Sequence, residues 1–403
     1  MRRLALTLAL CAATAATADT LGDLRAWLAK PVAERPALAG QPFAAAPLSR
    51  ADAAAVQDLL WADHVASFKA ERAAEVEARE LREGELVMPF WYTTYGDKPA
   101  DGRSLYISMH GGGSAPKAVN DQQYENQKRL YRPAEGVYLA PRAPTNTWNL
   151  WHEPHIDRLF DRLIQDLIVL EDVNPNRVYL MGYSAGGDGV YQLAPRMADR
   201  FAAAAMMAGH PNDASPLGLR NLPIILQVGA LDNGYNRNKI VLEWGQKLDD
   251  LRKADPDGYV HDVHLREGKA HWMDLEDAMA VPWMAACRRQ PQPTRVVWHQ
   301  SGTTHSRFYW LAVDADHQKA GADVVASRAG NVITVASSTV NKLTVLLNDA
   351  MADLDQPVAL RYGDQQLQSA KVSRTVGTIA RTLAEYGDPA SVYSAQLEVT
   401  LPN

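Results

Sequence analysis

Short apolar runs alternate with longer amphipathic stretches along the middle of the chain, from about residue 86 to residue 288. Within one stretch, apolar residues recur at intervals of three and four between Ile156 and Leu167, which indicates a helix. Buried strands that alternate with helices favour a doubly wound, mostly parallel sheet covered on both faces. The predicted strands are Leu86–Tyr92, Leu105–Met109, Val137–Ala140, Val178–Met181, Ala203–Met207, Ile224–Val228 and Val260–Leu265.

The pattern changes on either side of this α/β region. Residues 19–85 are predicted to be helical, with Ser49 as an N-cap, an acid at Asp52 and an Ala- and Glu-rich segment to about Arg82. After a Pro-rich linker at 289–294, turns separate short strands, which predicts a β-sandwich over 295–403. Its predicted strands are Val296–His299, Phe308–Val313, Val324–Ser327, Val332–Ala336, Leu343–Leu347, Val358–Tyr362 and Val392–Val399, and its predicted helix is Thr375–Ala384.

The first eighteen residues have the pattern of a secretory signal peptide. Arg2 and Arg3 precede an apolar stretch that ends in Ala16-Thr17-Ala18, a small-residue cleavage site. We therefore expect cleavage near Ala18 and export to a bacterial periplasm or the exterior. The apolar stretch is too short to span a bilayer, so we expect no membrane anchor. After cleavage Cys287 is the one remaining cysteine, which excludes an internal disulfide.

Composition and charge narrow the function classes. The chain has 403 residues, of which 47% are hydrophobic and 22% charged, with a net charge of −6. An acidic, unpatterned surface argues against a nucleic acid as partner. The sequence holds no phosphate-binding loop, dinucleotide fingerprint or paired-cysteine metal site, so we expect neither a cofactor nor a metal.

The strongest chemical signal is the segment Gly182-Tyr183-Ser184-Ala185-Gly186-Gly187. It follows a predicted strand and precedes a predicted helix, which is the context that a G-x-S-x-G nucleophile turn requires. The turn is sharp, so small residues must flank the serine, and the hydroxyl is held above the edge of the sheet. We predict that Ser184 is a nucleophile.

A second signal, His110-Gly111-Gly112-Gly113, directly follows the strand that ends at Met109. Consecutive glycines allow backbone N–H groups to approach a substrate oxygen closely. Such a loop forms the oxyanion hole in one group of esterases. The predicted donors are the N–H groups of Ala185 and of either Gly112 or Gly113.

A nucleophilic serine needs a base, and the base needs an acid that orients it. Asp232 follows the strand that ends at Val228, and His271 lies in a loop after the strand that ends at Leu265. The carboxyl ends of parallel strands meet at one edge of the sheet, so these residues can assemble beside Ser184. Asp213 and Asp250 are the alternative acids.

The order serine, aspartate, histidine and the two glycine motifs resemble the α/β-hydrolase superfamily over about residues 86–288. The segment is most similar to secreted serine esterases of the feruloyl-esterase and polyhydroxyalkanoate-depolymerase type. Its glycine loop resembles that of hormone-sensitive-lipase-like esterases, although Tyr183 stands where those enzymes usually have aspartate. The resemblance implies an acyl-enzyme mechanism without a cofactor.

Several residues near these motifs are weaker candidates for substrate contacts. They are His110, Tyr183, Trp148, Trp151, His152, His210 and Trp272. The group His152, Glu153, His155 and Asp157 lacks H-E-x-x-H spacing, and Pro154 is better explained as the start of a helix, so we predict no metal there.

Three functions remain open at this stage. The first is hydrolysis of small or polymeric carboxylic esters by Ser184, His271 and Asp232. The second is a peptidase of the same fold, although the N-terminal segment is too short and helical for the propeller that such peptidases often carry. The third is a catalytically inert binding protein whose C-terminal sandwich recognises a glycan or protein. No oligomeric state is predicted.

Overall fold

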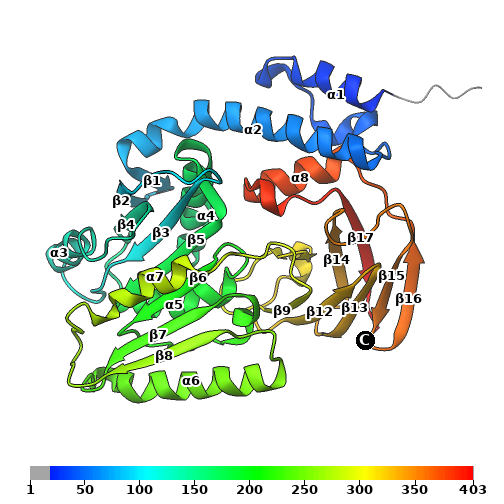
Figure 1. The fold of residues 1–403 in the computed structure, drawn as a ribbon. Helices are drawn as coiled ribbons and strands as arrows, with labels where there is room; N and C mark the ends of the chain where they lie inside the picture. The colour runs from blue at the N-terminus through cyan, green and yellow to red at the C-terminus, as the bar shows by residue number, and fades with distance from the viewer. Residues whose placement is uncertain (1–18, 403) are drawn as a thin grey trace, which may run out of the picture.

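The computed structural model describes residues 19–402, and its largest sheet has eight strands (Figure 1). The predicted signal peptide and its cleavage site lie outside the described residues. The strands follow the order β1-β2-β4-β3-β5-β6-β7-β8 across the sheet. Their bounds are β1 Glu80–Glu83, β2 Leu86–Tyr95, β3 Arg103–Met109, β4 Gly136–Pro141, β5 Val173–Tyr183, β6 Ala203–Met207, β7 Ile224–Gly229 and β8 His261–Arg266.

The neighbouring strands β4, β3, β5, β6, β7 and β8 pair in parallel, whereas β1 with β2 and β2 with β4 pair in antiparallel fashion. Each of the seven strands predicted for this region is present, so the expected mostly parallel sheet is confirmed. Parallel strands end at a common edge, and the loops after β3, β5, β7 and β8 therefore meet there. That edge carries every catalytic residue predicted above.

Helices cover both faces of this sheet because successive strand residues point to opposite sides. On one face Leu105, Ile107 and Met109 of β3 join the core under α4, α5 and α6. On the other face Tyr106 joins a second core with α7. The helices are α3 Lys117–Gln127, α4 Pro154–Leu170, α5 Ala185–Arg196, α6 Arg237–Ala254 and α7 Ala280–Ala285, with short 3₁₀ turns η4 Leu217–Asn221, η5 Gly234–Asn236 and η6 Glu276–Met279.

The N-terminal segment holds two helices, α1 Thr20–Leu28 and α2 Arg50–Ala78, and three 3₁₀ turns, η1 Val32–Glu34, η2 Leu38–Gly40 and η3 Pro42–Ala44. Ser49 caps α2 as predicted, because its hydroxyl accepts the backbone N–H of Asp52. The expectation of helix to about Arg82 is wrong. Arg79 adopts a left-handed φ of 58° that ends α2, and residues 80–83 form β1 in the large sheet.

Within residues 19–402, no helix is both long and apolar enough to cross a membrane.

The C-terminal region contains two further sheets, ordered β10-β11-β14-β17 and β16-β15-β13-β12-β9. The ring of Trp298 from one sheet stacks on that of Phe308 from the other, and both join one buried core, as a sandwich requires. The strands are β9 Arg295–His299, β10 Arg307–Phe308, β11 Leu311–Ala312, β12 Asp323–Ala329, β13 Val332–Ser338, β14 Lys342–Leu347, β15 Val358–Tyr362, β16 Gln365–Ala370 and β17 Ala395–Thr400. The remaining elements are α8 Val376–Tyr386, η7 Ala315–His317 and η8 Pro389–Ser391.

One strand predicted for this region is divided in the structure. Residues 308–313 were expected to run straight, but Tyr309 has a φ of 54° and the chain turns between β10 and β11. The turn is held by the α/β domain, because the Tyr309 hydroxyl donates to the carbonyl of Ala198 and its backbone N–H donates to Asp199. Trp310, which follows Tyr309, is fully buried. The polar strand β16 was not predicted.

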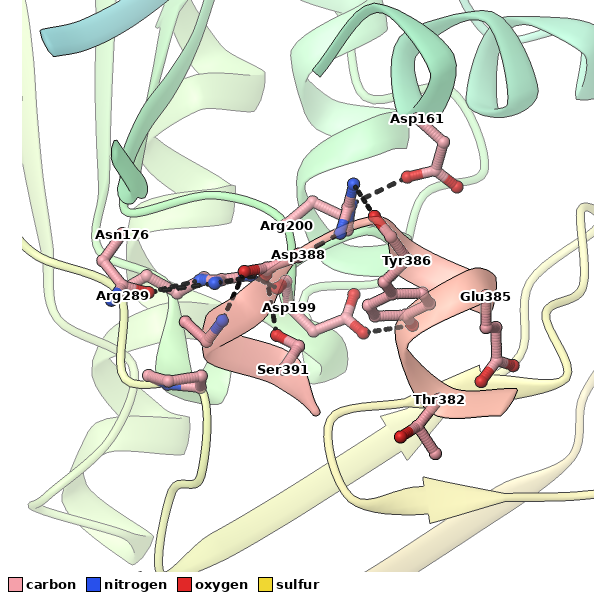
Figure 2. A network of polar contacts seen from close by, with 12 residues as sticks. Asp161, Asn176, Asp199, Arg200, Arg289, Thr382, Glu385, Tyr386, Asp388 and Ser391 are labelled. Carbon is pink, nitrogen blue, oxygen red and sulfur yellow. Dashed lines mark hydrogen bonds and ion pairs between the residues drawn. The ribbon is translucent and has the colours of Figure 1, made fainter. Parts of the chain in front are cut away.

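A buried polar network joins the two regions (Figure 2). Arg289 donates to Asp388 over 2.6 Å and to the side chain of Asn176. Burial would raise the pKa of Asp388, but the guanidinium groups of Arg289 and Arg200 outweigh that effect and hold the pKa below its usual range. The long helix α2 packs on both α4 and α8 and so also spans the two regions (Figure 1).

Candidate active site

Ser184 occupies a strained turn between β5 and α5. Its backbone has a φ of 57° and a ψ of −120°, a conformation that few non-glycine residues adopt. A Cβ atom at Gly182 would lie 2.2 Å from the carbonyl oxygen of Gly186, and one at Gly186 would lie 2.2 Å from that of Met109. Both glycines are therefore required for the close approach of backbone that lifts Ser184 out of the sheet.

Ser184, His271 and Asp232 form a hydrogen-bonded line across three loops. His271 Nε2 lies 3.0 Å from Ser184 Oγ, and His271 Nδ1 lies 2.7 Å from Asp232 Oδ2. The Asp232 side chain is only 3% exposed, whereas that of His271 is 44% exposed at the mouth of the site. The alternative acids lie elsewhere, since Asp213 accepts from Gln192 and Asp250 accepts from Gln246.

The glycine loop after β3 passes directly beside the serine. A Cβ atom at Gly111 would lie 3.1 Å from Ser184 Cβ. The N–H of Gly113 already donates to Asn120 Oδ1 over 2.9 Å, which leaves Gly112 as the loop's donor. Ala185 is the first residue of α5, so its N–H has no acceptor within the helix. The N–H groups of Ala185 and Gly112 can therefore bind an oxyanion.

Tyr183 fixes the loop that carries the histidine. Its hydroxyl donates to the carbonyl oxygen of His271 over 2.7 Å and accepts the backbone N–H of Met273 over 3.0 Å. The two bonds hold the chain on both sides of Trp272. Burial raises the pKa of Tyr183 well above its usual value, so the hydroxyl stays protonated and remains a donor.

Two cavities include Ser184 in their walls. The larger, of about 450 Å³, is mostly apolar and lined by Gly111, Gly112, Gln123, Asn126, Gln127, Leu130, Tyr183, Ser184, His271 and Trp272. The smaller, of about 210 Å³, is about half polar and lined by Gly112, Gly113, Ser114, Trp148, Ser184, Ala185, Asp188, His210, Asn212, Tyr235 and Arg237. We call them the apolar and the polar cavity. Of the predicted substrate contacts, Tyr183 and Trp272 line the apolar cavity, and Trp148 and His210 line the polar cavity.

Three of the predicted substrate contacts, His110, Trp151 and His152, line neither cavity. His110 is completely buried, and its Nδ1 donates to the carbonyl of Gly111 while its Nε2 accepts the N–H of Ala143. Burial lowers the pKa of His110 to about 3, so the ring is neutral and structural. Trp151 is also fully buried and donates to the His110 carbonyl. His152 packs edge-on against Trp148, and burial lowers its pKa to about 4.

Sequence analysis missed five residues that line the polar cavity, namely Ser114, Asp188, Asn212, Tyr235 and Arg237. Arg237 and Tyr235 follow Asp232 in the same loop, and this proximity along the chain was the one available signal. Asp188 lies in the first turn of α5. Its Oδ1 also accepts the backbone N–H of His210 over 2.6 Å, and burial raises its pKa to about 6.

The residues considered as metal ligands between 152 and 157 have other roles in the structure. Pro154 begins α4, and Asp157 is occupied by Arg196 and His305 rather than by the neighbouring histidines. In residues 19–402 no cluster of three or more histidine, cysteine, aspartate or glutamate side chains has a geometry that could hold a metal ion.

No protein-family model and no curated protein matches the chain. Among solved structures, a thermostable esterase is 19% identical with a TM-score of 0.39, and the match covers 52% of this chain and 62% of that one. The poly(3-hydroxybutyrate) depolymerase LpqC from Bordetella parapertussis is 14% identical with a TM-score of 0.38, covering 50% of this chain and 84% of that chain. The feruloyl esterase module from Clostridium thermocellum is 13% identical with a TM-score of 0.35, and the match covers 51% of this chain and 90% of that chain.

These similarities are too distant to assign a substrate, and the fold is defined instead by the molecule's own geometry. The mostly parallel eight-stranded sheet, the strained serine between β5 and α5, and the aspartate and histidine after β7 and β8 occur together. The chain has the α/β-hydrolase fold.

Proposed function

We propose that the protein is a serine hydrolase that cleaves carboxylic esters through an acyl-enzyme on Ser184. The observation that carries this proposal is the continuous hydrogen-bonded line from Ser184 through His271 to Asp232 at a strained serine. A nucleophile, a base within hydrogen-bond reach and a third group that orients the base are the parts that acyl transfer needs.

In the proposed mechanism, His271 Nε2 takes the proton from Ser184 Oγ as the oxygen attacks the ester carbonyl. Asp232 keeps the second proton on Nδ1 and stabilises the imidazolium. The N–H groups of Ala185 and Gly112 bind the oxyanion, where one such donor is worth about a hundred- to a thousandfold in turnover. His271 then protonates the leaving alcohol, and a water molecule activated by the same ring releases the acid.

We also propose that the enzyme acts outside the cytoplasm on a small or polymeric ester, without a cofactor. The support for export is the sequence of residues 1–18. The ester class is supported by an open site, since the mouth is exposed at His271 and Trp272.

Covalent labelling tests the proposal directly. The mature protein is treated with a fluorophosphonate, and intact mass is measured beside the variants Ser184→Ala and Ser373→Ala. Ser373 is an exposed serine of the C-terminal region and serves as the matched control. We expect one adduct on the wild type and on Ser373→Ala, and none on Ser184→Ala. An unlabelled, folded wild type that also fails to hydrolyse 4-nitrophenyl acetate would refute the proposal.

A further inference from the structure

The two cavities differ in chemistry, and both contain Ser184. An ester bound at Ser184 has an acyl part and an alcohol part, so each cavity is available to one of them. Which part enters which cavity follows from the position of His271. This argument rests on the proposed ester hydrolysis.

His271 lines the apolar cavity and does not line the polar cavity. The leaving oxygen must receive a proton from His271 Nε2, so it has to lie within hydrogen-bond reach of that atom. The alcohol therefore extends into the apolar cavity, past Leu130 and Trp272. The carbonyl oxygen points at Ala185 and Gly112, which leaves the polar cavity for the acyl chain.

The polar cavity presents hydrogen-bond donors that lack acceptors. Arg237 is only 11% exposed, and its Nε atom has no hydrogen-bond partner within residues 19–402. His210 Nδ1 accepts the backbone N–H of Asn212 over 2.9 Å, so in the neutral ring the proton is on Nε2, which is then a donor. Asp188, the cavity's carboxylate, already accepts from the backbone of His210 and the side chain of Asn212.

The charge of Arg237 is already compensated. Its Nη1 lies 3.7 Å from Asp232 Oδ1, and its charge also acts on Asp188. An acyl chain with a carboxylate would place a third negative charge near one guanidinium. A neutral oxygen can accept a hydrogen bond from the guanidinium of Arg237 at the cavity wall without that repulsion, whereas an alkyl chain offers the guanidinium no acceptor.

We propose that the polar cavity is the acyl subsite and that it selects acyl chains carrying an uncharged acceptor oxygen, such as an ether, hydroxyl or carbonyl, through Arg237 and His210. The apolar cavity takes an apolar alcohol. Arg237 is then the main determinant of acyl specificity.

Two isomeric esters test the orientation with the wild-type protein alone. Butyl 4-methoxybutanoate carries its extra oxygen on the acyl side, and 4-methoxybutyl butanoate carries it on the alcohol side. A hydrogen bond to a charged donor is worth about 1.5–3 kcal/mol, so we expect kcat/KM to favour the first isomer about ten- to a hundredfold. Equal rates, or a preference for the second isomer, would overturn the proposal.

The variant Arg237→Met tests the residue, and Arg252→Met is its matched control. Both arginines belong to α6, but Arg252 is exposed in the last turn, away from the cavity. We expect Arg237→Met to bring the ratio of the two isomers close to one and Arg252→Met to leave the ratio unchanged. A ratio that persists in a folded Arg237→Met variant would reject Arg237 as the determinant.

The failure of this inference is distinguishable from failure of the proposed function. If the wild type is labelled at Ser184 and hydrolyses both isomers without the expected preference, ester hydrolysis stands and the subsite assignment falls. If neither isomer is hydrolysed and no adduct forms, the proposed function itself falls.

A third ester, the monobutyl ester of succinic acid, tests the charge argument. If it is cleaved faster than butyl 4-methoxybutanoate, the choice of a neutral oxygen is overturned.

Discussion

Two histidine–aspartate pairs in this molecule have similar geometry and different surroundings. His271 lies 2.7 Å from Asp232 at the edge of the large sheet, and His305 lies 2.9 Å from Asp157 between the α/β domain and the C-terminal sheets. Both aspartate side chains are 3% exposed. In each pair a buried carboxylate orients an imidazole, so this contact alone does not identify a catalytic site.

The two pairs differ in the additional residue that each contacts. At the first pair the other ring nitrogen of His271 faces Ser184, a residue in a strained conformation with space around it. At the second pair Asp157 also accepts from Arg196, so charge is balanced within a structural contact. The polar network of Figure 2 lies beside this second pair and follows the same principle, with Arg289 and Arg200 set against Asp388. A nucleophile, rather than a histidine–aspartate pair, distinguishes the candidate active site.

The largest expected difference between the pairs is in activity. Replacing His271 with alanine should lower kcat by about a millionfold, because no other base reaches Ser184. The corresponding change His305→Ala should leave kcat within about threefold and lower stability instead, since His305 touches no reacting atom. Rates with 4-nitrophenyl acetate and melting temperatures of both variants test this. Comparable loss of activity in a folded His305→Ala variant would contradict the distinction.

The second prediction concerns the stability of the interface. Arg289→Met leaves Asp388 buried without its nearest cation, and removing one partner of a buried pair costs about 3–5 kcal/mol in the free energy of unfolding. The matched surface variant, Lys98→Met, breaks the exposed pair with Asp172 and should cost less than about 1 kcal/mol. Chemical denaturation of both variants measures the two costs. Similar losses would show that the network of Figure 2 does not hold the two regions together.

Much of the fold and of the candidate site could be predicted from sequence because the signals are local. The strained turn requires Gly182 and Gly186 at fixed spacing around Ser184, so the requirement is visible in five residues. Asp232 and His271 follow predicted strands, and parallel strands bring their ends together whatever the loops do. The divided strand at Tyr309 was not predictable, because contacts with Ala198 and Asp199, more than a hundred residues away, produce it.

The sequence also does not show in which direction the side chains of loop residues point. His110 and Trp151 lie in loops that reach the site, but both side chains point into the core and bond to backbone beside Gly111. Arg237 carries no motif, and its proposed importance arises from its place in the wall of the polar cavity, which depends on how α6 packs. Periodicity tells which strand precedes a loop, whereas burial of a loop side chain depends on tertiary contacts.

The smallest expected effect is in the pH dependence of stability at His305. Burial alone would lower the pKa of His305, but the hydrogen bond and charge of Asp157, with the charges of Asp161 and Asp199, outweigh it and raise the pKa. A raised pKa contributes stability that is fully present below the unfolded value of about 6.5 and is lost as pH rises through the folded value. The advantage of the wild type over His305→Gln, measured by denaturation, should therefore shrink as pH rises above about 6.5.

His152 is also a neighbour of Arg196, whose guanidinium donates to the His152 carbonyl oxygen, and it supplies the matched comparison with opposite sign. Burial, followed by the charge of Arg196, lowers the pKa of His152 to about 4, so the folded state disfavours its proton. The wild type should therefore lose stability relative to His152→Gln as pH falls from about 6.5 to 4, at up to about 1.4 kcal/mol per pH unit. As pH rises, the free energy of unfolding of the wild type falls relative to that of His305→Gln and rises relative to that of His152→Gln. The directions are opposite because the nearest charge to His305 is Asp157, whereas the charge of Arg196 acts on His152. Parallel slopes in the two variants would mean that burial governs both histidines and that the contact of His305 with Asp157 contributes no charge stabilisation.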